Sequence, residues 1–503
     1  MNRKLFFTCC LFFISIQSLI GQTVKINSSE LEKMMQLPQD DWLNLTLMGT
    51  KIGYAHIYME KSQYEGEDTI RIRADMEMAF KRSGTGLTIG TTRISYVGMD
   101  LVPRYFIATS NETGQVKRVE GQIKEGIASL KTTLAGKTTQ DHQPIPADTI
   151  FEQMISYLVL QRGVRVGEAY TLHVFNMDLM KPVKTHVKVI REDQIEHAGQ
   201  IQPVYIIDYT MDIMGGLTTT EWLGVTNGTT YRMEIGLMGM KMVLAKTDMQ
   251  TALGESGEVD VILNTKILAQ GRPPTPNARH LKAHLRLAEG ELDKAVLMNG
   301  RQKLSVDRDL GTGILEIDVP VVDAAKVPTV PVHTLPGREE LQQFLKSTVY
   351  IQAEHPAIRA QALEILDGET NAWTAAGKLS GWVHEHIEDK NLKVGFGSAL
   401  QTLESLEGDC TEHTVLMIAL ARSVGIPARV CAGLVFQRDA FYYHFWPEVY
   451  VGEWVAMEPT LGQIRADANH IQLAGSELES NSMLEFGEGV MRTLNQLEIE
   501  VIE

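Results

Sequence analysis

The chain has 503 residues, of which 44% are hydrophobic and 22% charged, a balance that excludes an intrinsically disordered or collagen-like protein. This length is too great for one hydrophobic core and predicts two or three domains. The formal net charge of −16 comes without a run of lysine and arginine, so we expect no nucleic acid among the partners.

The first 21 residues have the pattern of a secretory signal peptide. A short basic start with Arg3 and Lys4 precedes an apolar run over residues 5–20, and Gly21 begins a polar stretch. The apolar run is short for a membrane-spanning helix, although an uncleaved N-terminal anchor is the alternative. We therefore expect a protein that is periplasmic or secreted, with no stable membrane insertion after the signal is removed.

Residues 22–270 are predicted to form a β-rich domain of mostly antiparallel strands. Over residues 70–80, apolar side chains alternate with mostly charged ones, as in a half-buried antiparallel strand. Asn227 and Gly228 lie between two strand-like runs and indicate a hairpin. One helix, predicted over 148–163 with Asp148 as its cap, interrupts the strands.

Prolines divide the rest of the chain. Residues 271–277 contain three prolines and form the predicted linker. A small β-rich domain is predicted over 278–335, a catalytic domain over 336–475, and a C-terminal segment without assigned purpose over 476–503. The first part of the catalytic domain has helical periodicity, and helices are predicted over residues 339–345, 356–366 and 372–387.

A strong helix-start signal surrounds Cys410. Asp409 is a favoured N-cap, and Glu412 lies three residues later, which is the pattern of a capping box. The helix is predicted to end at Gly425. In its first turn a thiol faces unpaired backbone N–H groups and the positive end of the helix dipole, both of which lower a thiol pKa. Cys410 is therefore a candidate nucleophile, and an inert buried cysteine is the alternative.

A histidine and an acid follow on predicted strands. His444 lies within a strand over 441–451, where a satisfied core histidine is the alternative interpretation. Glu458 ends the next strand, 454–458. Because the three residue types arrive as a helix-start cysteine, a strand histidine and a strand acid, we expect His444 to act as the base and Glu458 to orient its imidazole.

The length of the hairpin loop between these two strands determines on which face of the sheet Glu458 lies. If the loop has only two residues, Glu458 emerges on the face opposite His444. A three-residue loop, or a bulge near Gly452, instead pairs Tyr450 with Trp454 and brings Glu458 to the face of His444. We predict the second arrangement.

Four stretches together resemble the transglutaminase-like superfamily. They are Gly-Asp-Cys-Thr-Glu-His-Thr around Cys410, Ala-Arg-Ser-Val-Gly-Ile-Pro-Ala-Arg-Val after it, His-Phe-Trp-Pro-Glu-Val-Tyr-Val from His444, and Trp-Val-Ala-Met-Glu-Pro-Thr around Glu458. Residues 466–471 are also similar to bacterial secreted members. The resemblance is strong over about 399–473 and extends more weakly back to about 336. It implies an α+β domain with a papain-like Cys-His-acid triad, in which a helix bundle packs on an antiparallel sheet. The family usually has Asp where this chain has Glu458.

This resemblance implies acyl transfer from an amide through a thioester. We expect an exported cysteine protease or amidase that acts on protein or peptide amides, because water is the abundant acceptor. A protein-crosslinking transglutaminase is one alternative, and a non-catalytic binding or assembly protein is another. No zinc or calcium motif is present in the sequence, so we expect no cofactor or metal. The sequence leaves the oligomeric state open.

The remaining polar residues near Cys410 are predicted to be structural. Asp409 and Glu412 are expected to cap the helix. His413 is expected to support the packing of the helix, and a contact with the site is the alternative. After signal removal, Cys431 is the one other cysteine of the chain, which excludes a disulfide-rich scaffold. We expect Cys431 in the core, and a disulfide with Cys410 is the alternative.

Overall fold

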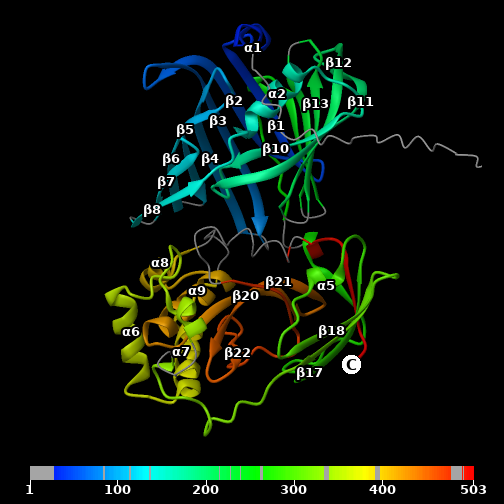
Figure 1. Cartoon of the computed structure of the whole chain (residues 1–503). Helices are drawn as coiled ribbons and strands as arrows, with labels where there is room; N and C mark the ends of the chain where they lie inside the picture. Colours follow the sequence, from blue (N-terminus) through cyan, green and yellow to red (C-terminus); the bar gives the residue numbers. More distant parts are fainter. Residues whose placement is uncertain are drawn as a thin grey trace, which may run out of the picture.

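The computed structural model describes residues 28–503, apart from 83–84, 113–114, 135–136, 214–215, 227, 238–239, 261–263, 333–338, 391–396, 477–489 and 491. The predicted signal peptide, residues 1–21, lies outside the described residues. Figure 1 shows two units, one of strands formed by the N-terminal half and one of helices and strands formed by the C-terminal half. Within the described ranges, no helix has the length and apolar character needed to cross a membrane.

A single sheet of fifteen strands makes up most of the N-terminal unit, as the predicted β-rich character requires. From β1 to β8 and from β9 to β15, strands that are consecutive in the chain are neighbours in the sheet, and β1 pairs with β15, so that β8 and β9 are its two edge strands. Among the described strand pairs of this sheet, the β9–β10 pair is the parallel one. The strands are β1 (Gln39–Leu47), β2 (Thr50–Tyr64), β3 (Glu67–Arg82), β4 (Thr85–Gly98), β5 (Pro103–Glu112), β6 (Gln115–Lys124), β7 (Ile127–Leu134), β8 (Lys137–Pro144), β9 (Thr149–Phe151), β10 (Ala169–Asn176), β11 (Lys181–His197), β12 (Gln200–Met211), β13 (Leu217–Gly224), β14 (Thr230–Leu237) and β15 (Met240–Thr247).

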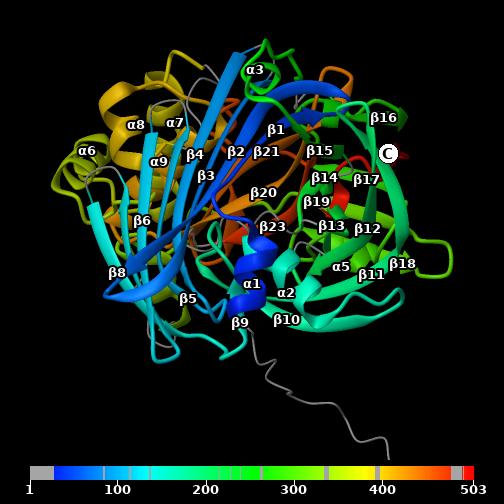
Figure 2. The same cartoon turned by 90° about the horizontal axis from the view of Figure 1, so that it is seen from above.

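Helices α1 (Ser28–Met35) and α2 (Ile155–Arg162) cover the core of this sheet, and α3 (Met249–Ala252) follows its last strand. Leu31 and Met35 of α1 and Ile155 of α2 are buried in one hydrophobic cluster with strand residues such as Val174. Figure 2 shows the two arms of the sheet on either side of α1 and α2. The helices therefore close the concave side of the sheet.

The helix predicted over 148–163 begins later than expected. Residues 149–151 form β9, a 3-10 turn η1 (Glu152–Met154) follows, and α2 then ends at Gly163, whose φ is +79°. Asp148 does not cap the helix, because its carboxylate instead binds the imidazole of His173 at 2.8 Å. The hairpin between β13 and β14 is present, with the Gly224 N–H donating to the carbonyl of Thr229 at 2.8 Å. Asn227 of the predicted turn is outside the described residues.

A second sheet organises the C-terminal unit. Its strand order is β18-β19-β17-β24-β16-β21-β20-β23, and β22 pairs with β21. The strands are β16 (Ile267–Gly271), β17 (His280–Leu287), β18 (Gln302–Asp307), β19 (Thr312–Asp318), β20 (Ala428–Gln437), β21 (Ala440–Tyr450), β22 (Trp454–Ala456), β23 (His470–Ser476) and β24 (Leu497–Val501).

This topology differs from the predicted division of the C-terminal half into separate segments. Strands from 278–335, from the catalytic segment and from 476–503 share one sheet. Leu285, Leu434 and Ile499, one from each of these segments, are buried in the same hydrophobic cluster. The predicted boundary at residue 335 therefore falls inside one packed unit, because the apolar faces of β17 and β19 are completed by strands from much later in the chain.

Helices gather on one side of the second sheet (Figure 1). They are η3 (Glu339–Leu345), a 3-10 helix, with α6 (Pro356–Leu366), α7 (Ala372–His386), α8 (Ala399–Ser405) and α9 (Cys410–Ser423), while the short α5 (Leu292–Ala295) lies near β18. The bounds of α6, α7 and α9 agree with the prediction to within about two residues. Thirteen of the fourteen residues of α9 are buried, and its apolar side chains share one cluster with β20 and β21. The unit is therefore an α+β fold with α9 at its centre.

Gly433 of β20 allows β23 to approach closely. A Cβ at this position would lie 1.9 Å from the carbonyl oxygen of Ile471 and 2.8 Å from the Trp446 ring. We expect Gly433→Ala to lower the free energy of unfolding by about 3 kcal/mol, the upper end of the usual range for overpacking. Urea unfolding measures this change. Gly475→Ala is the control, because its Cβ would meet nothing nearer than 3.4 Å, and an equal effect of both substitutions would contradict the argument.

Candidate active site

Cys410 is the first residue of α9, and its position is held by the capping box that the sequence predicted. The Asp409 carboxylate accepts from the Thr411 N–H at 2.8 Å, and the Glu412 carboxylate accepts from the Asp409 N–H at 2.9 Å. Gly408 has a φ of +143°, and a Cβ there would lie 2.3 Å from the Glu412 side chain. Glycine is therefore needed before the cap. Cys410 as a whole residue is partly exposed, unlike the rest of α9.

The hairpin that carries the histidine and the acid has the predicted register. Tyr450 pairs with Trp454, and the loop closes through a 2.9 Å hydrogen bond from the Val451 N–H to the carbonyl of Glu453. Gly452 has a φ of +106°, which accommodates the longer turn. Glu458 consequently emerges on the same face as His444, and not on the opposite one.

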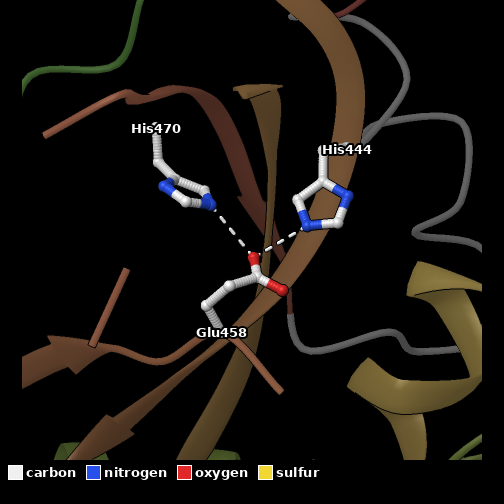
Figure 3. A group of neighbouring side chains, drawn as sticks. All are labelled: His444, Glu458 and His470. Atoms are coloured by element: carbon white, nitrogen blue, oxygen red, sulfur yellow. Dashed lines mark hydrogen bonds and ion pairs between the residues drawn. The ribbon is translucent and has the colours of Figure 1, made fainter. Parts of the chain in front are cut away.

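His444 is bound on two sides. Its Nε2 lies 2.7 Å from Oε2 of Glu458, as Figure 3 shows. The imidazole also lies close enough to the Cys410 thiol for each group to shift the pKa of the other. Because Nε2 is occupied by the carboxylate, Nδ1 is the nitrogen left for the thiol. The structure thus brings Cys410, His444 and Glu458 together in the order that the sequence predicted, and we call these three residues the triad.

Burial and charge act in opposite directions on the histidine and the acid. Burial disfavours the imidazolium, but the charges of Glu458 and Cys410 outweigh burial and raise the pKa of His444 to about 10. Burial likewise disfavours the carboxylate, but His444 and then His470 hold the pKa of Glu458 well below its usual range. At neutral pH the group therefore favours an imidazolium beside an ionised carboxylate.

The pKa of the Cys410 thiol is raised, whereas the position at the helix start alone predicted a lowered pKa. Burial and then the Asp409 carboxylate raise the pKa of Cys410, whereas His444 and the Phe445 N–H lower it. The sequence could not show this balance, because it depends on how deeply the folded chain surrounds the sulfur. Formation of the Cys410 thiolate therefore relies on the His444 imidazolium.

A second histidine, to which the sequence analysis assigned no role, binds the same acid. His470 at the start of β23 places its Nε2 3.0 Å from Oε2 of Glu458, and its Nδ1 lies 2.9 Å from Asp467. The other oxygen of Glu458 accepts from the Leu461 N–H at 3.0 Å. Both His470 and Glu458 have no exposed surface. The Asp-x-x-His spacing shortly after the Glu-Pro-Thr motif was the signal that could have suggested this pair.

His444, Glu458 and His470 each offer one metal-ligand atom, and these atoms lie within 4.8 Å of one another. The same three atoms are joined by hydrogen bonds that converge on one oxygen of Glu458. Figure 3 shows both imidazoles directed toward that carboxylate. The hydrogen bonds are thus sufficient to account for this geometry.

The residues expected to be structural lie in structural positions. His413 is fully buried and donates from Nδ1 to the Asp409 carbonyl at 2.7 Å, and burial lowers its pKa to about 4. Cys431 is a buried free cysteine whose sulfur accepts from the Gln472 amide at 3.1 Å. Cys410 is also free, so the structure contains no disulfide between these two cysteines.

Solved structures and curated proteins give distant similarities. An uncharacterized protein from Haemophilus influenzae is 29% identical over 119 residues, which are 23% of this chain and 32% of that protein. A candidate cysteine protease from Cytophaga hutchinsonii has 16% identity and a TM-score of 0.31, over 44% of this chain and 81% of that one. A beta-barrel-like protein with a domain of unknown function from Brucella abortus has 13% identity and a TM-score of 0.32, over 42% of this chain and 96% of that one.

Family models match two separate parts of the chain. Residues 43–245, within the fifteen-stranded sheet, match a family described as a protein of unknown function (DUF3108). Residues 359–459 match the transglutaminase-like superfamily, and this range contains the whole triad. The family model therefore confirms the resemblance that the motifs indicated, and the C-terminal half of this chain carries a transglutaminase-like domain.

Proposed function

We propose that this chain is a cysteine-dependent enzyme that transfers acyl groups from amide bonds, with Cys410 as nucleophile, His444 as base and Glu458 as the orienting acid. The observation that carries the proposal is the placement of His444 between the Cys410 thiol at a helix start and a fully buried carboxylate. A histidine with a purely structural role does not require a thiol at a helix start as its second partner.

The chemistry follows from these positions. His444 holds the Cys410 proton as an imidazolium, which leaves Cys410 as a thiolate. The thiolate attacks the amide carbonyl, and the Cys410 backbone N–H at the start of α9 is available to stabilise the oxyanion. The imidazolium gives its proton to the leaving amine, and a thioester remains. His444 then deprotonates a water molecule, which attacks the thioester and releases the acid. Throughout, Glu458 holds the imidazole tautomer and stabilises the imidazolium.

Water is the proposed acceptor, so the enzyme is a protease or amidase acting on protein or peptide amides. A lysine amine in place of water would give a crosslinking transglutaminase, and loss of turnover would leave a binding or assembly protein. We also propose that residues 1–21 direct export, which places the reaction in the periplasm or outside the cell. The support for export is the basic start and apolar run of this segment.

Incubation of the protein with casein and a fluorescent primary amine distinguishes these reactions by mass spectrometry of the products. We expect new peptide ends or deamidated glutamines, with little incorporation of the amine, and none of these products with Cys410→Ala. Amine incorporation that exceeds hydrolysis would instead support the crosslinking enzyme. Absence of all products over a panel of protein substrates would contradict the proposed hydrolase and favour the binding protein.

A further inference from the structure

The acid of the triad is shared between two histidines. His470 faces Glu458 with one ring nitrogen at 3.0 Å and Asp467 with the other at 2.9 Å. Oxygens of an ionised carboxylate only accept hydrogen bonds, so both nitrogens of His470 must carry a hydrogen if both contacts are hydrogen bonds. The geometry thus describes a buried imidazolium between two carboxylates.

The charges around His470 agree with this assignment. Burial disfavours the charged imidazole, but the hydrogen bonds and charges of Asp467 and Glu458 outweigh burial and raise the pKa of His470. The pKa of the Asp467 carboxyl is lowered, because His470 offsets the cost of its burial. An ion pair of this kind is stable in the interior only when its remaining polar atoms are also satisfied.

Asp467 meets that condition through several donors. Its carboxylate accepts from the backbone N–H groups of Asn277 and Asn469, each at 3.0 Å, and from the Gln463 amide at 3.2 Å. Asn277 belongs to the segment predicted as a linker. The position of Asp467 is therefore set partly by a segment almost two hundred residues earlier in the chain.

Arg301 fixes the same loop from the other side. Its buried guanidinium donates to the carbonyl oxygens of Ala466 at 3.4 Å, Asp467 at 2.7 Å and His470 at 3.3 Å. Three hydrogen bonds to one short stretch of backbone restrict its movement. A loop held in this way can present an imidazole to Glu458 with little freedom.

We infer that Asp467 and His470 are positioning residues of the active site: the buried imidazolium of His470 holds the Glu458 carboxylate toward His444 and takes up part of its negative charge. This inference rests on the proposed function of the triad. It also gives a reason for glutamate at position 458, because the longer side chain brings one carboxylate oxygen within hydrogen-bonding distance of both imidazoles.

Without the positive charge of His470, the negative charge of Glu458 would be balanced by His444 alone among the two imidazoles that bind it. The His444 imidazolium would then be more stable, and its pKa would rise above the value of about 10 in the unchanged protein. The other charged or titratable side chains near this group remain in place in the variant. Cys410 interacts electrostatically with His444, and Lys390 and His413 each interact with Glu458. Arg301 interacts with both Asp467 and Glu448.

The test is an NMR titration of the His444 ring in the full-length protein labelled with carbon-13 histidine, compared among the unchanged protein, His470→Gln and Asp467→Asn. We expect an upward shift of the His444 midpoint in His470→Gln. A smaller upward shift is expected in Asp467→Asn, where the imidazole remains but loses one stabilising carboxylate. Amide hydrolysis, where measurable, is expected to fall on the order of tenfold or more in both variants, as for other groups that orient a catalytic side chain.

An unchanged midpoint in a folded His470→Gln protein would overturn the inference, because a merely structural residue would alter stability and not this titration. If His470→Gln does not fold, Asp467→Asn decides by the same criterion. Stoichiometric zinc in the purified protein that is lost in His470→Gln would also overturn it. The titration does not depend on turnover, so failure of the proposed function would appear separately, as an inert Cys410.

Discussion

Cys410→Ala is expected to abolish amide turnover, with a loss of at least about 10⁴-fold, as for removal of other catalytic nucleophiles. Among the described residues the other free cysteine is Cys431, which is fully buried and therefore not placed to replace Cys410. The loss should appear in the catalytic rate and not in the folding of the domain, since the substitution removes only one sulfur atom from the first residue of α9, which is not a fully buried residue. Initial rates on a cleaved peptide and thermal unfolding of the same samples measure the two effects.

Cys431→Ala is the matched control for this substitution. The Cys431 sulfur packs in a cluster with Trp446 and accepts a hydrogen bond from Gln472, and Cys431 is not one of the triad residues. We expect turnover within a few-fold of the unchanged protein. Turnover that survives Cys410→Ala but disappears with Cys431→Ala would reverse the assignment of the nucleophile.

Glu458→Gln is expected to reduce turnover by roughly 10²- to 10⁴-fold while leaving the triad in place. Glutamine can still accept from His444 but carries no charge, so the imidazolium loses its main stabilising partner. The pKa of His444 should therefore fall from about 10. Rate measurements over a pH series, together with the histidine titration, test both consequences.

Glu458→Asp separates the charge of this residue from its reach. Aspartate keeps the charge and is the usual acid of the family, but its carboxylate lies one methylene further from the two histidines. We expect a loss smaller than that of Glu458→Gln. Full turnover in Glu458→Gln would show that the buried carboxylate has no part in the reaction.

Local signals were sufficient to predict the two ends of the triad. The capping box of Asp409 and Glu412 joins residues no more than three positions apart in the chain, so its hydrogen bonds depend little on the rest of the fold. The pairing of Tyr450 with Trp454 could be predicted because the period of a strand leaves only two faces, and only one of them brings Glu458 to His444.

Contacts between distant segments could not be predicted from such signals. The Asp467–His470 pair is held by Asn277 and Arg301, which precede it by well over a hundred residues. The union of residues 278–335 with the catalytic segment depends on β24 entering the sheet from the end of the chain. The raised pKa of Cys410 likewise results from tertiary burial, whereas the sequence shows only that the thiol starts a helix.

The central claim is that Cys410 and His444 act as a pair, and the rate of iodoacetamide alkylation at Cys410 tests it most directly. Mass spectrometry gives this rate at neutral pH for the unchanged protein and for His444→Ala, with the buried Cys431 as an internal reference. We predict that His444→Ala slows labelling of Cys410 by about tenfold or more, because one unit of thiol pKa changes the thiolate fraction tenfold and His444 is a main influence that lowers this pKa. Equal labelling rates in the two proteins would contradict the account.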